Sequence, residues 1–226
     1  MKELEKHEKE VYSKWDMDLR ENRLVIVHKM ILEEKPEKML DIACSSGKFS
    51  SCFIKNGWKV FGIDISDNVF YAKERGLEAI KSNITEGVPF KNESFDLIFA
   101  GEIIEHIVDT DFFLSEIYRV LKKSGILIIT TPNLASFENR MRLLFGIYPI
   151  WVNYSIEGTG HVRSYTPKVL KKQLNQHDFI IISHEGNFIP ILPQFILNDV
   201  NFPLLSLTRN FYPNLSQCII LKAKKR

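Results

Sequence analysis

The residues best suited to chemistry begin with two acids, Asp41 and Asp64, each at the end of an apolar segment. The first acid is followed by a run of small residues, ACSSG at positions 43–47. Small side chains let a ligand approach the backbone closely. A carboxylate that follows the second apolar segment can accept hydrogen bonds from both hydroxyls of a ribose. The two segments therefore predict a crevice that binds a nucleoside-containing cofactor.

A second group of residues could move a proton or contact a substrate. Glu102 and His106 are four residues apart, so a helix would place them on one face, where the carboxylate would orient the imidazole as a general base. His161 is a second candidate base, and Arg163 and Tyr165 are candidate substrate contacts, Arg163 for an anionic group. A histidine that only packs or caps has the same pattern, and both interpretations stay open.

An alternation of strand and helix patterns positions these residues. It predicts an α/β fold with a mostly parallel sheet and helices on both faces, so that the carboxyl ends of the strands meet at the crevice. The predicted strands are residues 38–43, 59–65, 79–81, 94–100, 125–130, 179–184 and 216–223. The predicted helices are residues 4–17, 23–33, 47–56, 67–75, 109–121, 138–144 and 166–176.

Length and composition limit the alternatives. The 226 residues suit one domain, 1–226, with a helical N-terminal segment (1–35) and two irregular insertions (133–161 and 188–213). A net charge of +2 argues against nucleic acid as a partner. Three cysteines without C-x-x-C spacing predict neither a disulfide framework nor a metal site. We expect a cytoplasmic protein, because the charged N-terminus is unlike a secretory signal and no apolar run is long enough to span a bilayer.

Five segments match one known family in order and spacing: residues 40–47, 62–66, 89–98, 105–106 and 119–125. The chain resembles the class I S-adenosylmethionine (SAM)-dependent methyltransferases over residues 20–184 and the final strand. It looks closest to the branch with ubiquinone-type and polysaccharide- or lipid-biosynthesis enzymes. The resemblance implies a Rossmann-like, seven-stranded sheet with the last strand antiparallel. It also implies SAM as cofactor and S-adenosylhomocysteine as product.

The resemblance assigns cofactor contacts by position. Asp41 would order the turn near the methionine end of SAM, Ile65, Asn83 and Ile84 would flank the adenine, and Asp64 would bind the ribose. The remaining implied contacts are the turn residues Ala43, Cys44, Ser45 and Gly47, and Ala100 and Gly101 beside the reacting methyl group.

The chain departs from the family pattern at two places. The family's turn is usually D-x-G-x-G-x-G, whereas Ala43 and Ser45 replace the first two glycines here. We expect the turn to survive if φ is negative at both positions and to be strained if φ is positive. Asn83 stands where the family usually has an acid, and its amide can still hydrogen-bond an adenine edge.

These features favour an enzyme that methylates a small-molecule or lipid- or sugar-linked acceptor, most simply at oxygen, while N- and C-methylation stay open. A general base is needed when the acceptor is a neutral hydroxyl. One alternative is a non-catalytic SAM-binding scaffold. A nucleic-acid methyltransferase is disfavoured, because AGE at 100–102 replaces the D/N-P-P-Y motif, and a nicotinamide enzyme would need G-x-G-x-x-G.

The apolar connection 188–213 is open to two interpretations. It could be a packed lid or a subunit interface, as in a homodimer. It could also be a surface for a lipid-linked acceptor, with peripheral membrane contact.

Overall fold

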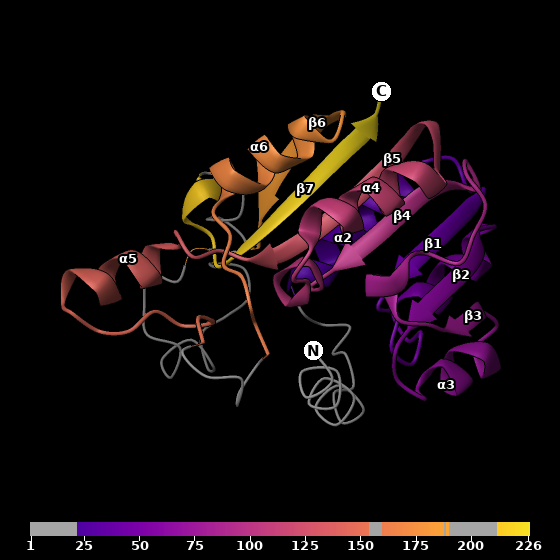
Figure 1. Cartoon of the computed structure of the whole chain (residues 1–226), viewed down its shortest axis with the longest axis horizontal. Coiled ribbons are helices and arrows are strands. Elements are labelled where there is room, and N and C mark those ends of the chain that lie inside the picture. The colour runs from indigo at the N-terminus through magenta and orange to yellow at the C-terminus, as the bar shows by residue number, and fades with distance from the viewer. Residues whose placement is uncertain (1–21, 154–159, 188, 190–211) are drawn as a thin grey trace.

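A twisted seven-stranded sheet forms the centre of the computed structural model, which describes residues 22–153, 160–187, 189 and 212–226 (Figure 1). The strand order is β3-β2-β1-β4-β5-β7-β6. The strands are β1 (Lys38–Ile42), β2 (Lys59–Asp64), β3 (Glu78–Lys81), β4 (Phe95–Gly101), β5 (Leu121–Pro132), β6 (Phe179–Gly186) and β7 (Cys218–Lys225). Pairs among the first five strands are parallel, and β7 is antiparallel to both β5 and β6. This order confirms the predicted α/β fold with an antiparallel last strand.

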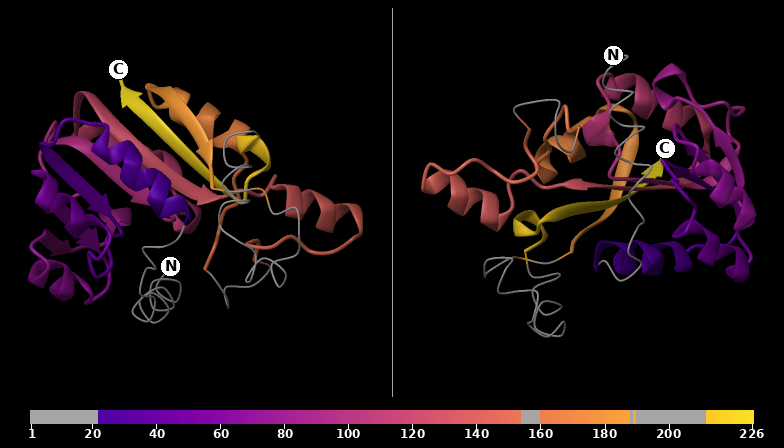
Figure 2. Two further views of the ribbon diagram at one scale, coloured as in Figure 1. Left: turned by 180° about the vertical axis from the view of Figure 1, so that it is seen from behind. Right: turned by 90° about the horizontal axis from the view of Figure 1, so that it is seen from below.

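Helices cover both faces of the sheet, as Figure 2 shows from below. The α-helices are α2 (Asn22–Leu32), α3 (Val69–Glu74), α4 (Thr110–Val120), α5 (Phe137–Leu144) and α6 (Pro167–Gln176). Short 3-10 helices lie at η1 (Ser50–Asn56), η2 (Ile84–Glu86), η3 (Ile104–His106) and η4 (Pro213–Leu215). One apolar core joins α2, η1 and α3 to the sheet, and a second joins α4 and α6 to its other face. The two cores hold the strand ends in fixed register.

Two differences from the sequence predictions concern local geometry. The segment 47–56 forms the 3-10 helix η1 in place of an α-helix, and it ends as predicted at Gly57, whose φ is 90°. Strand β5 extends well beyond 125–130, because Leu121 also pairs with Phe95 of β4 across an irregular step. The expected helix 4–17 and nearly all of the connection 188–213 lie outside the described residues.

Helix α5 projects from the end of the sheet opposite β3 (Figure 1). The helix and the loop after it expose large apolar side chains, namely Leu143, Leu144, Phe145, Ile147, Tyr148 and Trp151. Exposed apolar side chains gathered on one surface are typical of a site that contacts a protein partner, a ligand or a membrane. Among the described residues, no helix is long and apolar enough to cross a membrane.

Candidate active site

The turn between β1 and η1 has a left-handed backbone at three positions. The φ angles are 62° at Ala43, 46° at Ser45 and 69° at Gly47. Of the two conditions considered for Ala43 and Ser45, the structure therefore has the positive φ, and the turn keeps the shape of a glycine turn without the first two glycines. A left-handed conformation costs a non-glycine residue roughly 1–2 kcal/mol. Ala43 and Ser45 are thus strained, which is the outcome expected for positive φ.

Hydrogen bonds hold this turn against β2. The Cys44 N–H donates to the carbonyl of Ile63 (3.0 Å), and the Ser45 N–H donates to Asp64 Oδ2 (2.7 Å). Asp64 Oδ1 accepts from both the N–H and the hydroxyl of Ser66, at 2.8 and 2.6 Å. A carboxylate has about four acceptor positions. The three bonds to Asp64 leave Oδ2 able to accept one ribose hydroxyl beside the Ser45 amide.

Asp41 ends β1 beneath the turn and is 4% exposed. It accepts a hydrogen bond from the hydroxyl of Ser50. Burial raises the pKa of Asp41 to about 7, an effect that the Ser50 bond reduces and the nearby Asp64 carboxylate increases. The same surroundings raise the pKa of the Cys44 thiol well above its ordinary value. The turn therefore rests on an acid that titrates near neutral pH and on an unreactive thiol.

The carboxyl ends of β3 and β4 lie at the same edge of the sheet as those of β1 and β2, where the cofactor is predicted to bind. The register aligns Ile42 of β1 with Ile63 of β2 and with Ala100 of β4, so these carboxyl ends share one edge of the sheet. Asn83 caps η2, where its Oδ1 accepts from the N–H and hydroxyl of Thr85 at 3.0 and 2.8 Å. Its amide therefore has a structural role that the sequence did not reveal.

The other predicted contacts at this edge differ in exposure. Ile84 is 9% exposed, Ala100 is fully buried, and Ile65 and Gly101 are half-buried. A side chain at Gly101 would collide with the ring of Phe99 (2.4 Å). The cofactor roles of these residues stay predictions.

Arg23, which the sequence reasoning missed, reaches this edge from α2. Its side chain is 6% exposed, its NH1 donates to Thr130 Oγ1 (3.1 Å), and its Nε lies 3.8 Å from Glu102 Oε1. Glu102 also accepts from Thr130 Oγ1 (2.8 Å). A buried arginine beside a carboxylate can bind a ligand carboxylate with two parallel bonds. The only indication in the sequence was a single arginine at a position of α2 that faces the sheet. We overlooked it because the pattern of α2 is dominated by its apolar stripe.

Glu102 and His106 do not share a helical face. Glu102 has φ 52°, and the following helix η3 contains only residues 104–106. The Glu102 carboxylate binds Thr130, whereas His106 Nδ1 lies 3.2 Å from the carbonyl of Gly160. The predicted Glu102–His106 pair is therefore wrong in geometry, because the backbone turns between the two residues. The catalytic role of each residue stays a prediction.

His161 lies beside His106, with ring centroids 4.8 Å apart and the rings nearly perpendicular. His161 Nδ1 lies 2.8 Å from the carbonyl of Trp151. Burial lowers the pKa of both rings, that of His106 to about 3, and both are neutral at pH 7. A carbonyl oxygen only accepts, so the Nδ1 atoms carry the protons and each Nε2 keeps its lone pair. This tautomer is the one that a general base needs.

Glu105, for which the sequence left a solvated or a structural role open, is buried and has structural contacts. It is 1% exposed, and its pKa is raised well above the ordinary value by burial and by the nearby Glu102. Its Oε2 accepts from Thr131 Oγ1 (2.9 Å), and its Oε1 is buried without a hydrogen-bond partner. The Glu105 carbonyl also accepts from the N–H groups of Val162 and Arg163, at 2.9 and 3.1 Å. Glu105 therefore fixes the segment that carries His161.

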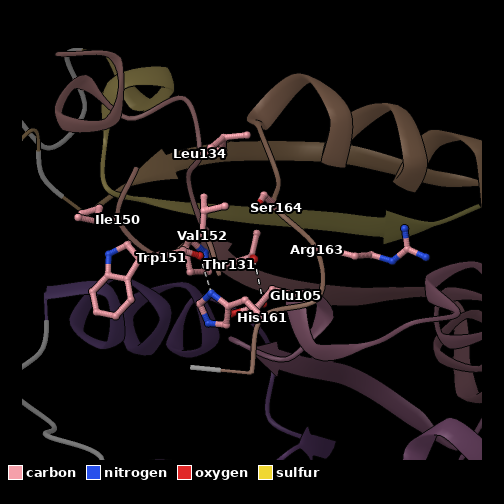
Figure 3. A pocket seen from close by; sticks show the side chains of 10 residues that line it. Glu105, Thr131, Leu134, Ile150, Trp151, Val152, His161, Arg163 and Ser164 are labelled. Atoms are coloured by element: carbon pink, nitrogen blue, oxygen red, sulfur yellow. Dashed lines mark hydrogen bonds between the residues drawn. The ribbon is translucent and has the colours of Figure 1, made fainter. Parts of the chain in front are cut away.

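A small pocket opens beside this group (Figure 3). Its lining includes Leu134, Ile150, Trp151 and Val152 from the 133–161 insertion, together with Glu105 and His161. The 133–161 insertion thus forms a wall of this pocket, and its role on the acceptor side stays a prediction. An apolar wall with a few converging polar groups is typical of a small-molecule site.

Arg163 and Tyr165 are placed less favourably for substrate contact. The Arg163 side chain extends away from His161 (Figure 3), and its Nε lies 3.1 Å from the carbonyls of both Ile107 and Val108. Tyr165 is 4% exposed, and its hydroxyl donates to Gln173 Oε1 (3.1 Å). Arg163 is among the residues that line the pocket, whereas Tyr165 is not. Their predicted substrate contacts stay predictions.

Within the described residues, one group of side chains has the composition of a metal site, although the sequence predicted none. Glu105, His106 and His161 each offer a ligand atom, and these atoms lie within 4.8 Å of one another. Neutral imidazole rings and a buried carboxyl of raised pKa are equally suited to proton transfer, so their composition does not by itself assign a metal.

Comparisons with known proteins agree with this geometry. A family model described as "Methyltransferase domain" matches residues 40–129, which contain the turn and strands β2 to β4. The "Ubiquinone biosynthesis O-methyltransferase" of Rhodopseudomonas palustris is 30% identical over 160 residues, covering 66% of this chain and 60% of that protein. The protein of the same name from Pelagibacter ubique is 38% identical over 101 residues, 42% of each chain. The chain thus spans less than two thirds of these relatives.

Solved structures share the fold at lower identity. A SAM-dependent methyltransferase from Thermotoga maritima superposes with a TM-score of 0.67 at 18% identity, covering 100% of both chains. One from Archaeoglobus fulgidus gives 0.63 at 19% identity, covering 90% of this chain and 92% of that one. At this identity the likeness supports the fold alone.

Proposed function

We propose that this chain, which belongs to the class I SAM-dependent methyltransferases, is an O-methyltransferase. It transfers the methyl group of SAM to a hydroxyl oxygen of a small-molecule acceptor. The observation that carries the proposal is the 2.8 Å distance between His161 Nδ1 and the Trp151 carbonyl, which assigns the tautomer of this ring. Its Nδ1 proton is held by the Trp151 carbonyl, so the Nε2 lone pair can accept a proton beside the pocket.

The donor set at the sheet edge fits SAM, which carries a sulfonium, an ammonium, a carboxylate and a ribose diol. Arg23 is the buried cation suited to the carboxylate, and Asp64 has one acceptor position left for the ribose. Asp41 and Glu102 supply negative charge for the cationic groups. Bound SAM supplies an electrophilic methyl group. The chain's own residues orient that group and exclude water from it.

On the acceptor side, His161 removes the hydroxyl proton as the oxygen attacks. The nearby Glu102 carboxylate raises the pKa of His161, opposing the effect of burial, and so stabilises the ring once it is protonated. Glu105 keeps the His161 segment next to the β4 loop through its carbonyl. Apolar side chains of the 133–161 insertion keep the pocket dry.

The test is His161→Ala, assayed with a panel of phenolic and aliphatic hydroxyl compounds and titrated calorimetrically with SAM. Loss of a general base lowers turnover by roughly a hundredfold or more. We expect SAM affinity to change less than twofold. His184→Ala is the matched control, because His184 is also a half-buried histidine of lowered pKa but lies on β6 against Lys171. Loss of SAM binding in His161→Ala, or equal loss of turnover in the control, would remove His161 from the acceptor side.

A finer proposal concerns the acceptor, which we infer to be lipid-linked and presented at a membrane surface. Support comes from the exposed apolar side chains of α5 and its loop, which belong to the same insertion as the pocket wall. Leu144→Glu should reduce cosedimentation with phospholipid vesicles at least fivefold. Phe70→Glu, at an equally exposed aromatic on α3, is the control. Equal binding of both variants would exclude this surface.

A further inference from the structure

Four hydrogen bonds close a ring around the strained turn. The Ser45 N–H donates to Asp64 Oδ2 (2.7 Å), and Asp64 Oδ1 accepts from the Ser66 hydroxyl (2.6 Å). The Ser66 hydroxyl accepts from the Asn68 N–H (3.3 Å). Asn68 Nδ2 then donates back to the Ser45 hydroxyl (3.2 Å). The ring joins the turn after β1 to the segment between β2 and α3.

The ring uses a side chain that glycine would lack. Ser45 has φ 46°, so its Cβ makes the backbone less favourable, but its hydroxyl provides the acceptor for Asn68. A second contact acts on the same turn, because Arg75 NH1 donates to the Ser46 carbonyl (3.1 Å). Asn68 and Arg75 flank α3 on either side. Helix α3 is therefore attached to the turn at both ends.

We infer that Asn68 is a positioning residue for the cofactor. It holds Ser45 in its left-handed conformation and orients the Asp64 carboxylate. At position 45, these polar contacts stabilise a backbone conformation that glycine would adopt without them. The inference rests on the proposed function for the identity of the ligand. The ring itself is a property of the chain without ligand. Asn68 acts through Ser45 and Asp64 and makes no contribution to the chemical step.

The inference predicts coupling between Asn68 and the residue type at position 45. Asn68→Ala breaks the ring and leaves the strain at Ser45, so SAM affinity should fall about fivefold, the effect of one hydrogen bond. In a Ser45→Gly background the turn needs no support, so Asn68→Ala should change affinity less than twofold. Asn56→Ala, an exposed asparagine at the end of η1, is the control and should have no effect in either background.

Two measurements separate this inference from the proposed function. Calorimetric titration with SAM gives the four affinities of the cycle. Hydrogen exchange of the Ser45 amide, measured by NMR without ligand, should become at least fivefold faster in Asn68→Ala, because its bond to Asp64 loses support. Equal effects of Asn68→Ala in both backgrounds, or unchanged exchange at Ser45, would overturn the inference. Failure of every variant and of the unaltered chain to bind SAM would overturn the proposed function, while the exchange result would still decide the role of Asn68.

Discussion

Replacing Asp41 with asparagine should stabilise the protein at alkaline pH. The Asp41 carboxyl is buried and has a pKa of about 7 in the folded chain, against an ordinary value of 3.8. A difference of this size corresponds to about 4 kcal/mol. Because the folded-state pKa is raised, the favourable contribution is full below pH 3.8 and is lost as pH rises to about 7. Above pH 7 the folded chain must bury the charged carboxylate, a cost that asparagine removes.

The measurement is urea unfolding of both proteins from pH 5 to pH 8. The difference in unfolding free energy between Asp41→Asn and the unaltered chain should grow in favour of the variant by about 1.4 kcal/mol per pH unit up to pH 7, then level off. Taking the difference cancels the other titrating groups. Glu74→Gln, at an exposed acid of α3, should show no such growth. A flat difference for Asp41→Asn would mean that Asp41 is ionised in the folded protein throughout, and the reasoning from burial would be refuted.

Asp41→Asn should also weaken SAM binding. The ionised carboxylate that destabilises the folded chain above pH 7 would then be the group that binds the cationic ligand. A cationic ligand stabilises the ionised carboxylate, so binding below pH 7 should release protons and affinity should rise with pH. Calorimetry in buffers of different ionisation enthalpy measures the protons released. Asp41→Asn should abolish most of that release and lower affinity by tenfold or more at pH 8. Unchanged proton release would place the ligand's cationic groups away from Asp41.

Two further predictions concern stability. Arg119→Met should lower the free energy of unfolding, measured in urea, by about 2–3 kcal/mol. The Arg119 guanidinium donates to both carboxylate oxygens of Glu116 at 2.7 Å and to the carbonyls of Val88 and Phe90. An effect below about 0.5 kcal/mol would contradict this prediction. Gly47→Ala should cost at least about 2 kcal/mol, since φ is 69° and the new Cβ would lie 2.9 Å from the Cβ of Ala72. A thermal scan of that variant with an unchanged midpoint would show that the turn relaxes.

The strands and the order of their ends could be predicted from the sequence because each depends on a local pattern. Alternating apolar segments placed β1, β2 and β4, and Gly57 marked the end of η1. The φ angle at Ser45 could not be predicted, because it depends on contacts with Asp64 at the end of β2 and with Asn68, which precedes α3. No pattern within the turn itself contains that information.

The positions of two acids, Glu105 and Glu102, show the same limit at the pocket. A charged residue in a loop is most often solvated. Glu105 is buried because Thr131, far along the chain, supplies a hydrogen-bond donor and because the segment that carries His161 packs over it. Glu102 turns away from His106 because Thr130 and Arg23 attract its carboxylate. Long-range partners, which sequence spacing does not reveal, decided each case.

The two halves of the site therefore differ in how they are built. The cofactor half lies on strand ends whose register is fixed by the sheet, with the Asn68 ring bracing its one unusual turn. The proposed acceptor half consists of two segments, 102–108 and 160–165, joined through the Glu105 carbonyl and the Arg163 side chain. Changes in the 133–161 insertion can reshape the pocket wall without moving the strand ends. In the proposed enzyme, acceptor choice can thus vary while cofactor geometry is kept, because the backbone bonds of Glu105 hold the segment next to His161, and within the wall only Trp151, whose carbonyl lies 2.8 Å from His161 Nδ1, also positions that ring.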